Sequence, residues 1–252
     1  MTEDNLSIKN IKYEDGLFLD TGKFDEVKMY HDMGLIKGVT TNPTILLKNG
    51  ITGGLEGVKK ASQAIAAYIA PYPLSVELTI NDNTEQMIAQ AIEFHDWAPN
   101  IVIKVPFHGP YGETSNINVI RELENTYHIP VNVTAMMNVQ QCYLAAVAGA
   151  TYVSLFCGRI NDMGYDSSHE TARLRKMLDM NKLKSKIICA STREVLNVTQ
   201  WMEAGGHVVT VAPDIMGKLI PHPYTKETVQ MFMRDAKKLL AELEPMKLPD
   251  DK

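Results

Sequence analysis

Eight short apolar segments recur along the 252-residue chain, and longer segments with helical periodicity separate them. Strand–helix alternation of this kind predicts parallel strands joined by right-handed crossovers. Eight such units in about 220 residues are typical of a closed (β/α)8 TIM barrel, so we predict one barrel domain over residues 1–252. The predicted strands are residues 17–20, 38–41, 74–78, 101–105, 130–134, 152–156, 186–190 and 208–211.

An open, doubly wound α/β sheet is the alternative fold. Such a sheet would place a glycine-rich turn after its first strand. The residues at that point are Asp20-Thr21-Gly22-Lys23, which do not match GxGxxG. The barrel is therefore the favoured architecture.

The helical segments include one more helix than a minimal barrel needs. Residues 214–220 follow the last strand, and Pro221 and Pro223 end that helix. A further amphipathic helix is predicted at residues 226–243. We expect residues 225–244 to pack on a neighbouring subunit, although such a helix can also cap its own barrel, and we expect 245–252 to be disordered. The other predicted helices are 84–97, 113–127, 139–148, 168–180 and 194–204.

Charge and composition argue against several kinds of partner. The net charge is −5 and the pI is near 5.8, which disfavours nucleic acid. No apolar run reaches membrane-spanning length, so no membrane partner is expected. The three scattered cysteines form no CxxC pair, and the polar start of the chain shows no signal peptide. We therefore expect a cytoplasmic protein, and because the seven histidines show no ligand spacing, we expect no metal or other cofactor.

Lys104 lies within the apolar run Ile101-Val102-Ile103-Lys104-Val105-Pro106. A buried ammonium without a partner is costly and tends to lose its proton. The neutral amine is a nucleophile toward carbonyl carbon. The alternatives are that Lys104 reaches solvent at the strand end or pairs with a buried acid.

Polar residues lie within or just after nearly every predicted strand. Any one of them alone could be a helix cap or a satisfied core group. Because the C-terminal ends of barrel strands carry the active site, we predict that together they form one site. The candidates are Asp20, Thr41, Asn42, Glu77, Lys104, Asn132, Thr134, Ser154, Arg159, Ser191 and Arg193.

Six stretches of the sequence closely resemble the transaldolase family, in the short-chain branch that also includes the fructose-6-phosphate aldolases. The resemblance spans roughly residues 16–240, and its TTNPT, IKVP and GRI motifs are together highly specific. It implies a (β/α)8 barrel, a role in the pentose phosphate pathway and ring-like homo-oligomers such as pentamers or decamers. The stretches are GLFLDTGKFDEV, GLIKGVTTNPTIL, IVIKVP, VNVTAMMNVQQ, ATYVSLFCGRIND and ICASTRE.

The resemblance also implies roles for the catalytic candidates. Lys104 would form a Schiff base with the C2 carbonyl of a ketose. Asp20 would take the proton of the C4 hydroxyl as the C3–C4 bond breaks. Glu77 and Thr134 would hold a water that moves protons while the Schiff base forms and is lost.

The remaining candidates would bind a sugar phosphate. Asn42 and Asn132 would hydrogen-bond the hydroxyls of the retained dihydroxyacetone unit. Arg159, Ser191 and Arg193 would bind the terminal anion, because arginine forks suit phosphate oxygens. Thr41 and Ser154 complete the predicted substrate-binding set.

Two positions favour group transfer over simple cleavage. Glu77 and Asn132 match the transaldolase pattern, whereas the aldolases carry glutamine at the position of Glu77. Met137 departs from both branches, which show phenylalanine or tyrosine there. The loop at residues 107–112 is longer than usual and is expected to reshape the acceptor pocket.

Other functions remain open at this point. They are a lyase that releases free dihydroxyacetone, a transaldolase for another anionic ketose such as a sulfonated one, and a non-catalytic sugar-phosphate binding protein.

Overall fold

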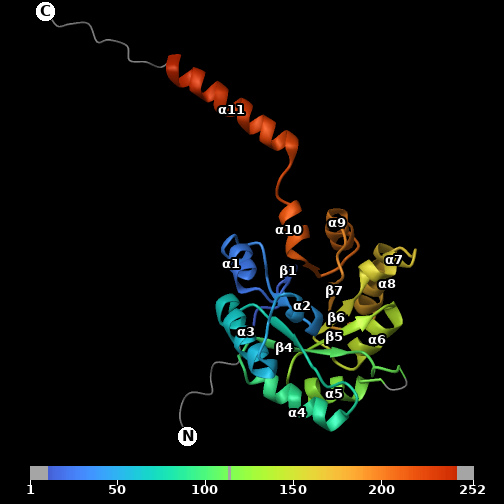
Figure 1. The fold of residues 1–252 in the computed structure, drawn as a ribbon. Coiled ribbons are helices and arrows are strands. Elements are labelled where there is room, and N and C mark those ends of the chain that lie inside the picture. The colour runs from blue at the N-terminus through green and yellow to red at the C-terminus, as the bar shows by residue number, and fades with distance from the viewer. Residues whose placement is uncertain (1–10, 113–114, 243–252) are drawn as a thin grey trace, which may run out of the picture. The chain divides into compact units, whose positions relative to one another are not determined.

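A computed structural model describes residues 11–112 and 115–242 of the chain. Eight parallel strands form a closed barrel in sequence order, with β8 pairing back to β1. The predicted (β/α)8 barrel is therefore confirmed, and Figure 1 shows the strands inside a ring of helices. The strands are β1 (Gly16–Asp20), β2 (Val39–Thr40), β3 (Leu74–Glu77), β4 (Ile101–Pro106), β5 (Val131–Met136), β6 (Tyr152–Leu155), β7 (Lys186–Cys189) and β8 (Val208–Val211).

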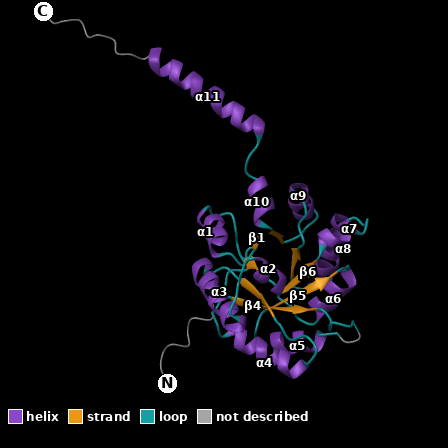
Figure 2. Ribbon diagram, viewed as in Figure 1, coloured by secondary structure: helices purple, strands orange, loops and turns teal. Residues whose placement is uncertain are grey.

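Most helices between the strands surround the barrel, whereas the short helix at Pro43–Lys48 lies over the ends of the strands (Figure 2). The helices predicted at 84–97, 139–148, 168–180 and 194–204 are present with similar bounds, whereas no bounds were predicted for the helices at Phe24–Asp32 and Gly54–Ile69. The helix predicted at 113–127 begins later, at Ile117, and residues 113–114 lie outside the described part. The helices of the barrel are α1 (Phe24–Asp32), α2 (Pro43–Lys48), α3 (Gly54–Ile69), α4 (Thr84–His95), α5 (Ile117–Asn125), α6 (Val139–Val147), α7 (Cys157–Asp162), α8 (Ser167–Met180), α9 (Val195–Glu203) and α10 (Pro213–Lys218).

The barrel interior is filled by side chains, so it is a core and not a pore. Phe18, Val102, Tyr152, Ile188 and Val208 form a buried cluster drawn from five strands. This packing leaves the C-terminal ends of the strands as the place where a cavity can form.

One glycine makes room for an aromatic ring of this core. A Cβ on Gly38 would lie 2.6 Å from the Phe18 ring, closer than real Cβ atoms come to their neighbours. Gly38 directly precedes β2, so its missing side chain lets β2 approach β1 and bring Thr40 beside Asp20.

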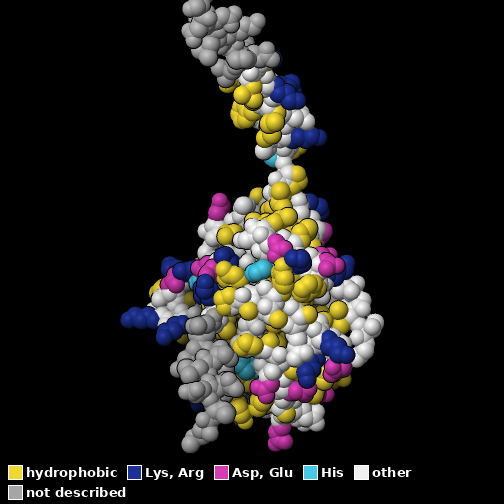
Figure 3. Space-filling view, turned by 90° about the vertical axis from the view of Figure 1, so that its left-hand side faces the viewer, with side chains coloured by type: hydrophobic (Ala, Val, Ile, Leu, Met, Phe, Trp, Pro, Cys, Tyr) yellow, Lys and Arg dark blue, Asp and Glu magenta, His cyan; other side chains and the backbone are white. Residues whose placement is uncertain are grey.

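The residues from 217 onward form a separate unit, which contains α11 (Pro223–Glu242). The predicted last helix is thus confirmed, and it begins three residues earlier than the predicted residue 226 because a proline suits the first helical turn. Its apolar side chains gather along one side, opposite its Lys and Arg residues (Figure 3). Phe232 is 61% and Leu240 67% exposed. The predicted packing of this helix on a neighbouring subunit stays a prediction, and the tail at 245–252 lies outside the described residues.

No helix in the described ranges 11–112 and 115–242 has the length and apolar character needed to cross a bilayer.

Candidate active site

A cavity of about 590 Å³ opens at the C-terminal ends of the barrel strands. It is the place where the sequence predicts the active site. Nine of the eleven predicted site residues line it, and the exceptions are Thr41 and Asn132. The nine are Asp20, Asn42, Glu77, Lys104, Thr134, Ser154, Arg159, Ser191 and Arg193.

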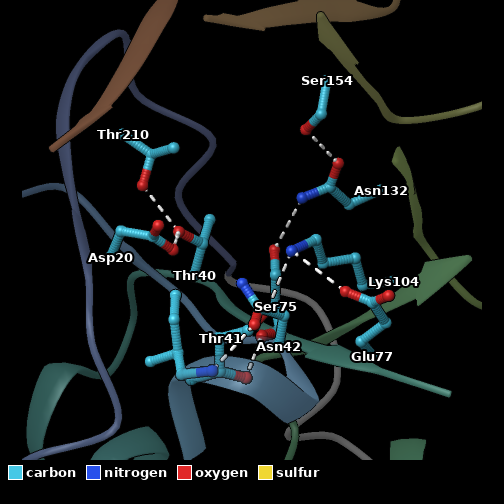
Figure 4. Close-up of polar contacts among 11 residues, drawn as sticks. Asp20, Thr40, Thr41, Asn42, Ser75, Glu77, Lys104, Asn132, Ser154 and Thr210 are labelled. Carbon is cyan, nitrogen blue, oxygen red and sulfur yellow. Dashed lines mark hydrogen bonds and ion pairs between the residues drawn. The ribbon is translucent and has the colours of Figure 1, made fainter. Parts of the chain in front are cut away.

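Lys104 lies on β4 with its side chain inside the barrel, and only 5% of the residue is exposed. Register places Glu77 of β3 directly beside it. The Lys104 Nζ lies 3.2 Å from Glu77 Oε2 and donates to the Thr41 carbonyl oxygen at 2.9 Å (Figure 4). Lys104 therefore points inward as predicted and is paired with an acid, which offsets the cost of burying its charge.

Asp20 ends β1 and accepts a hydrogen bond from Thr40 of β2, which in turn contacts Thr210 of β8 (Figure 4). Thr40 Oγ1 donates to Asp20 Oδ1 at 2.6 Å and lies 2.6 Å from Thr210 Oγ1. Because the single Thr40 proton goes to Asp20, Thr210 donates to Thr40. Burial raises the pKa of Asp20, and the charge of Lys104 and the Thr40 hydrogen bond partly offset that rise.

Asn132 is fully buried next to Lys104, below the residues that line the cavity. Its Nδ2 donates to Ser75 Oγ at 3.1 Å, and its Oδ1 accepts from Ser154 Oγ at 2.7 Å (Figure 4). Each end of the amide thus makes one hydrogen bond within the protein. Ser154 is the member of this chain of hydrogen bonds that reaches the cavity.

Thr41 does not line the cavity, but it contacts Lys104, which does. Its hydroxyl donates to the Ser75 carbonyl at 2.8 Å, while its own carbonyl accepts from Lys104. Thr41 therefore orients the lysine through its backbone.

Asn42 lines the cavity and also caps α2. Its Oδ1 accepts from the Ile45 N–H at 2.9 Å, as expected of a helix N-cap. Capping and binding do not compete here, because the cap uses the oxygen and leaves the Nδ2 donor of the amide for another partner.

The end of β5 departs from regular strand geometry beside the cavity. The register with β6 shifts between Val133 and Met136, and Ala135 has a φ of 59°. Thr134, Ala135 and Met137 all line the cavity. Thr134 Oγ1 is buried and has no hydrogen-bond partner among the described residues, so this hydroxyl is available to a bound molecule.

The rim of the cavity carries two arginines, Arg159 in α7, which follows β6, and Arg193 in the loop after β7. The guanidinium of Arg159 lies over the Phe156 ring, 5.5 Å from its centroid, and no described carboxylate pairs with it. Arg193 Nη2 donates to Asp162 Oδ2 at 2.9 Å. Ser191 joins them with a φ of 66°, a left-handed conformation that is uncommon outside glycine.

Several residues of the site escaped prediction. Thr40 donates to Asp20, Thr210 contacts Thr40, and Ser75 supports Asn132. Ser75 lies two residues before Glu77 on β3, so alternation along a strand could have placed it on the same face. Lys48 lines the cavity from the end of α2.

The long loop after β4 does not line this cavity, and its expected effect on the acceptor pocket stays a prediction. None of residues 107–112 is among those lining the cavity. The loop is instead tied to the loop after β3, where Asn81 donates to the His108 carbonyl at 3.1 Å.

No group of three or more His, Cys, Asp or Glu side chains suited to a metal ion occurs within residues 11–112 and 115–242. The three cysteines are buried and free.

Comparison with known proteins agrees with this geometry. The family model described as "Transaldolase/Fructose-6-phosphate aldolase" matches residues 17–252. The chain belongs to this family. A probable transaldolase 2 of Listeria monocytogenes is 35% identical over 218 residues, covering 86% of this chain and 94% of that protein. A probable transaldolase of Thermoplasma acidophilum is 34% identical over 225 residues, covering 88% and 96%.

Membership of the transaldolase/fructose-6-phosphate aldolase family makes the chain an enzyme of sugar metabolism. Solved structures with low sequence identity support the fold alone. Thiamine phosphate pyrophosphorylase from Pyrococcus furiosus aligns with a TM-score of 0.57 at 10% identity, over 80% of this chain and 87% of that one.

Proposed function

We propose that this enzyme is a transaldolase that moves a dihydroxyacetone unit from a ketose phosphate of the fructose 6-phosphate type to an aldose phosphate. The observation that carries the proposal is the Lys104 amine, buried 3.2 Å from the Glu77 carboxylate in a cavity with two arginines at its rim. We place the enzyme in the cytoplasm and expect a ring-like homo-oligomer.

Schiff-base formation begins with the transfer of a proton from Lys104 to Glu77, directly or through a water. The neutral amine then attacks the C2 carbonyl of the ketose. The resulting carbinolamine loses its hydroxyl as water, with a proton returned by Glu77, and a protonated Schiff base remains. The unpartnered hydroxyl of Thr134 supports a role in holding the water.

Carbon–carbon cleavage uses the carboxylate of Asp20. Asp20 takes the C4 hydroxyl proton, the C3–C4 electron pair moves toward the Schiff base, and an aldehyde leaves. The remaining enamine attacks the carbonyl carbon of the acceptor aldehyde, and Asp20 returns its proton to the new hydroxyl. The raised pKa of Asp20 suits a group that must accept and return a proton.

Binding of the sugar is assigned to the remaining lining residues. The free amide donor of Asn42 and the hydroxyl of Ser154 suit the hydroxyls of the dihydroxyacetone unit. Arg159, Arg193 and Ser191 suit the terminal phosphate. Asn132 would act through Ser154, because it accepts the Ser154 hydrogen bond and does not itself line the cavity.

Trapping with borohydride tests the Schiff base. Reduction in the presence of fructose 6-phosphate should attach the dihydroxyacetone skeleton to the peptide that contains Lys104, as read by mass spectrometry. Lys104→Met should abolish the adduct. An adduct on another residue, or one that survives this substitution, would refute the assignment.

A lyase that releases dihydroxyacetone is the second candidate, since the family includes both activities. Met137 lines the cavity and is 38% exposed, but it has no hydroxyl to protonate the enamine. We therefore expect the enamine to wait for an aldehyde, and transfer to exceed release by more than about a hundred-fold, which a barrier difference of roughly 3 kcal/mol achieves.

Measuring free dihydroxyacetone with and without an aldose phosphate separates the two activities. Met137→Tyr should raise the release of dihydroxyacetone, whereas Met137→Leu should not. Release by the wild type as fast as transfer would identify a lyase.

A further inference from the structure

The short helix α7 lies directly against the loop that follows β7. The Gly158 N–H donates to the Ala190 carbonyl at 3.3 Å. A Cβ on Gly158 would lie well under 3.0 Å from the Ser191 carbonyl oxygen, a separation that real Cβ atoms do not show. Alanine in a helix is favoured over glycine by about 1 kcal/mol, and the backbone of Gly158 is not left-handed. The close contact, and not the backbone conformation, therefore requires glycine.

Helix α7 is connected to both arginines of the rim. Arg159 is the residue after Gly158, and Asp162 at the end of α7 accepts a hydrogen bond from Arg193 at 2.9 Å. The Cγ of Arg193 would also lie 3.2 Å from a Cβ on Gly158. A methyl group at this point would push on the backbone of Ser191 and on the side chain of Arg193 together.

The loop after β7 cannot easily move aside. Thr192 Oγ1 donates to the Thr210 carbonyl at 2.6 Å, and Asn197 Oδ1 accepts from the Arg193 N–H at 3.1 Å. Ser191 lies directly before these two anchors and already has a left-handed conformation. A displacement at Ser191 therefore reaches Arg193 instead of being absorbed by the loop.

We propose that Gly158 and Asp162 are positioning residues that fix the separation of Arg159 and Arg193 for the terminal anion of the substrate. The proposal rests on the function proposed above. Neither Gly158 nor Asp162 lines the 590 Å³ cavity around Lys104. Asp162 does line a neighbouring cavity of about 970 Å³, together with Arg159 and Arg193. Its contact with the Lys104 cavity therefore runs through Arg193, and that of Gly158 through the loop that carries Arg193. Their loss lowers the preference for a phosphorylated ketose and spares the chemistry at Lys104.

A pair of glycine substitutions tests the contact in the full-length enzyme. Gly57, in the first turn of α3, lines neither this cavity nor the neighbouring one, and a Cβ there would overlap the Thr52 carbonyl as severely. We measure the ratio of kcat/KM for fructose 6-phosphate to kcat/KM for fructose. Gly158→Ala should lower this ratio about ten-fold or more, and Gly57→Ala should leave it unchanged.

An unchanged ratio in Gly158→Ala, or an equal fall in both variants, would overturn the proposal. Repeating Gly158→Ala in an Arg193→Ala background adds a further check. There the substitution should cause a much smaller fall, and a fall of the same size would contradict action through Arg193.

Asp162→Ala tests the same idea in case the added methyl group prevents folding. The Asp162 side chain is 52% exposed, so its removal leaves the core intact. If Asp162 positions Arg193, the ratio falls. If it only neutralises Arg193, its loss raises the preference for phosphate, which would overturn its assignment as a positioning residue.

The wild-type enzyme separates failure of this proposal from failure of the proposed function. Absence of a borohydride adduct at Lys104, or equal kcat/KM for fructose 6-phosphate and fructose, would count against the proposed function itself. If Gly158→Ala and Asp162→Ala retain both the adduct with dihydroxyacetone and the wild-type ratio, only the proposed positioning by α7 is refuted, and the proposed function stands.

Discussion

Asp20 is a buried carboxylate, and on balance its surroundings disfavour its charged form. Burial raises its pKa, while Lys104 and the Thr40 hydroxyl lower it by a smaller amount. Because Asp20 must be ionised to accept the C4 proton, activity should rise with pH as it deprotonates, above the usual carboxyl range. Thr40→Val removes a hydrogen bond that favours the charged form, so the acidic limb of the profile of kcat/KM against pH should move to higher pH. An unmoved limb would mean that another group controls it.

Asp20 should also cost the enzyme stability. A folded-state pKa above the unfolded value gives stability at low pH, which is lost as pH rises through the folded pKa. At neutral pH the charged Asp20 therefore disfavours the folded state. Asp20→Asn should reduce kcat about 10²- to 10⁴-fold without lowering the free energy of unfolding at pH 7, measured by urea denaturation. A large loss of stability would point to a structural role.

The limits of sequence reasoning follow from the chemistry of single residues. Lys104 and Glu77 stand out because charges rarely occur inside apolar strands. Thr40 and Thr210 do not stand out, because threonine is a common strand residue and only the barrel register brings them to Asp20. Thr41 acts through its backbone carbonyl. Every residue has one, so the residue type gives no sign of this contact.

At the scale of elements, the strands were the most predictable feature of the fold. Their two buried faces make them continuous apolar runs, which a sequence displays directly. The short helices α2 and α7 were not predicted, because six residues hold less than two turns and show little periodicity, and neither is followed by prolines such as those that mark the end of α10. Both lie beside the cavity, so the contacts of α7 with the loop after β7 became visible only in three dimensions.

Helix α2 joins capping and binding in one residue, and substitution can separate them. Asn42→Ala loses the cap to Ile45 and should lower the free energy of unfolding by about 1 kcal/mol. Asn42→Ser restores an N-cap oxygen and should recover most of that stability. Because serine cannot replace the Nδ2 donor, both variants should lose roughly ten-fold in kcat/KM for fructose 6-phosphate. Recovery of activity by serine would show that Asn42 is only a cap.

At the scale of the whole molecule, helix α11 has an apolar side, and its sequence predicts a contact with a neighbouring subunit. Its apolar residues lie on one side of the helix, opposite its cations (Figure 3). A stripe of this size is costly to leave in water. We therefore propose that α11 packs on a neighbouring subunit and that the enzyme assembles through this face.

A matched pair of charge substitutions on the full-length chain tests this assembly. Phe232→Glu places a carboxylate in the apolar stripe, whereas Gln230→Glu adds the same charge about half a turn away, on the polar side of the helix. Light scattering after size-exclusion chromatography should give a smaller particle for Phe232→Glu and the wild-type mass for Gln230→Glu. Circular dichroism should show the same helix content in both, because glutamate is a good helix former. An unchanged mass for Phe232→Glu would mean that the stripe covers its own barrel, and an equal loss in both variants would mean that net charge alone controls assembly.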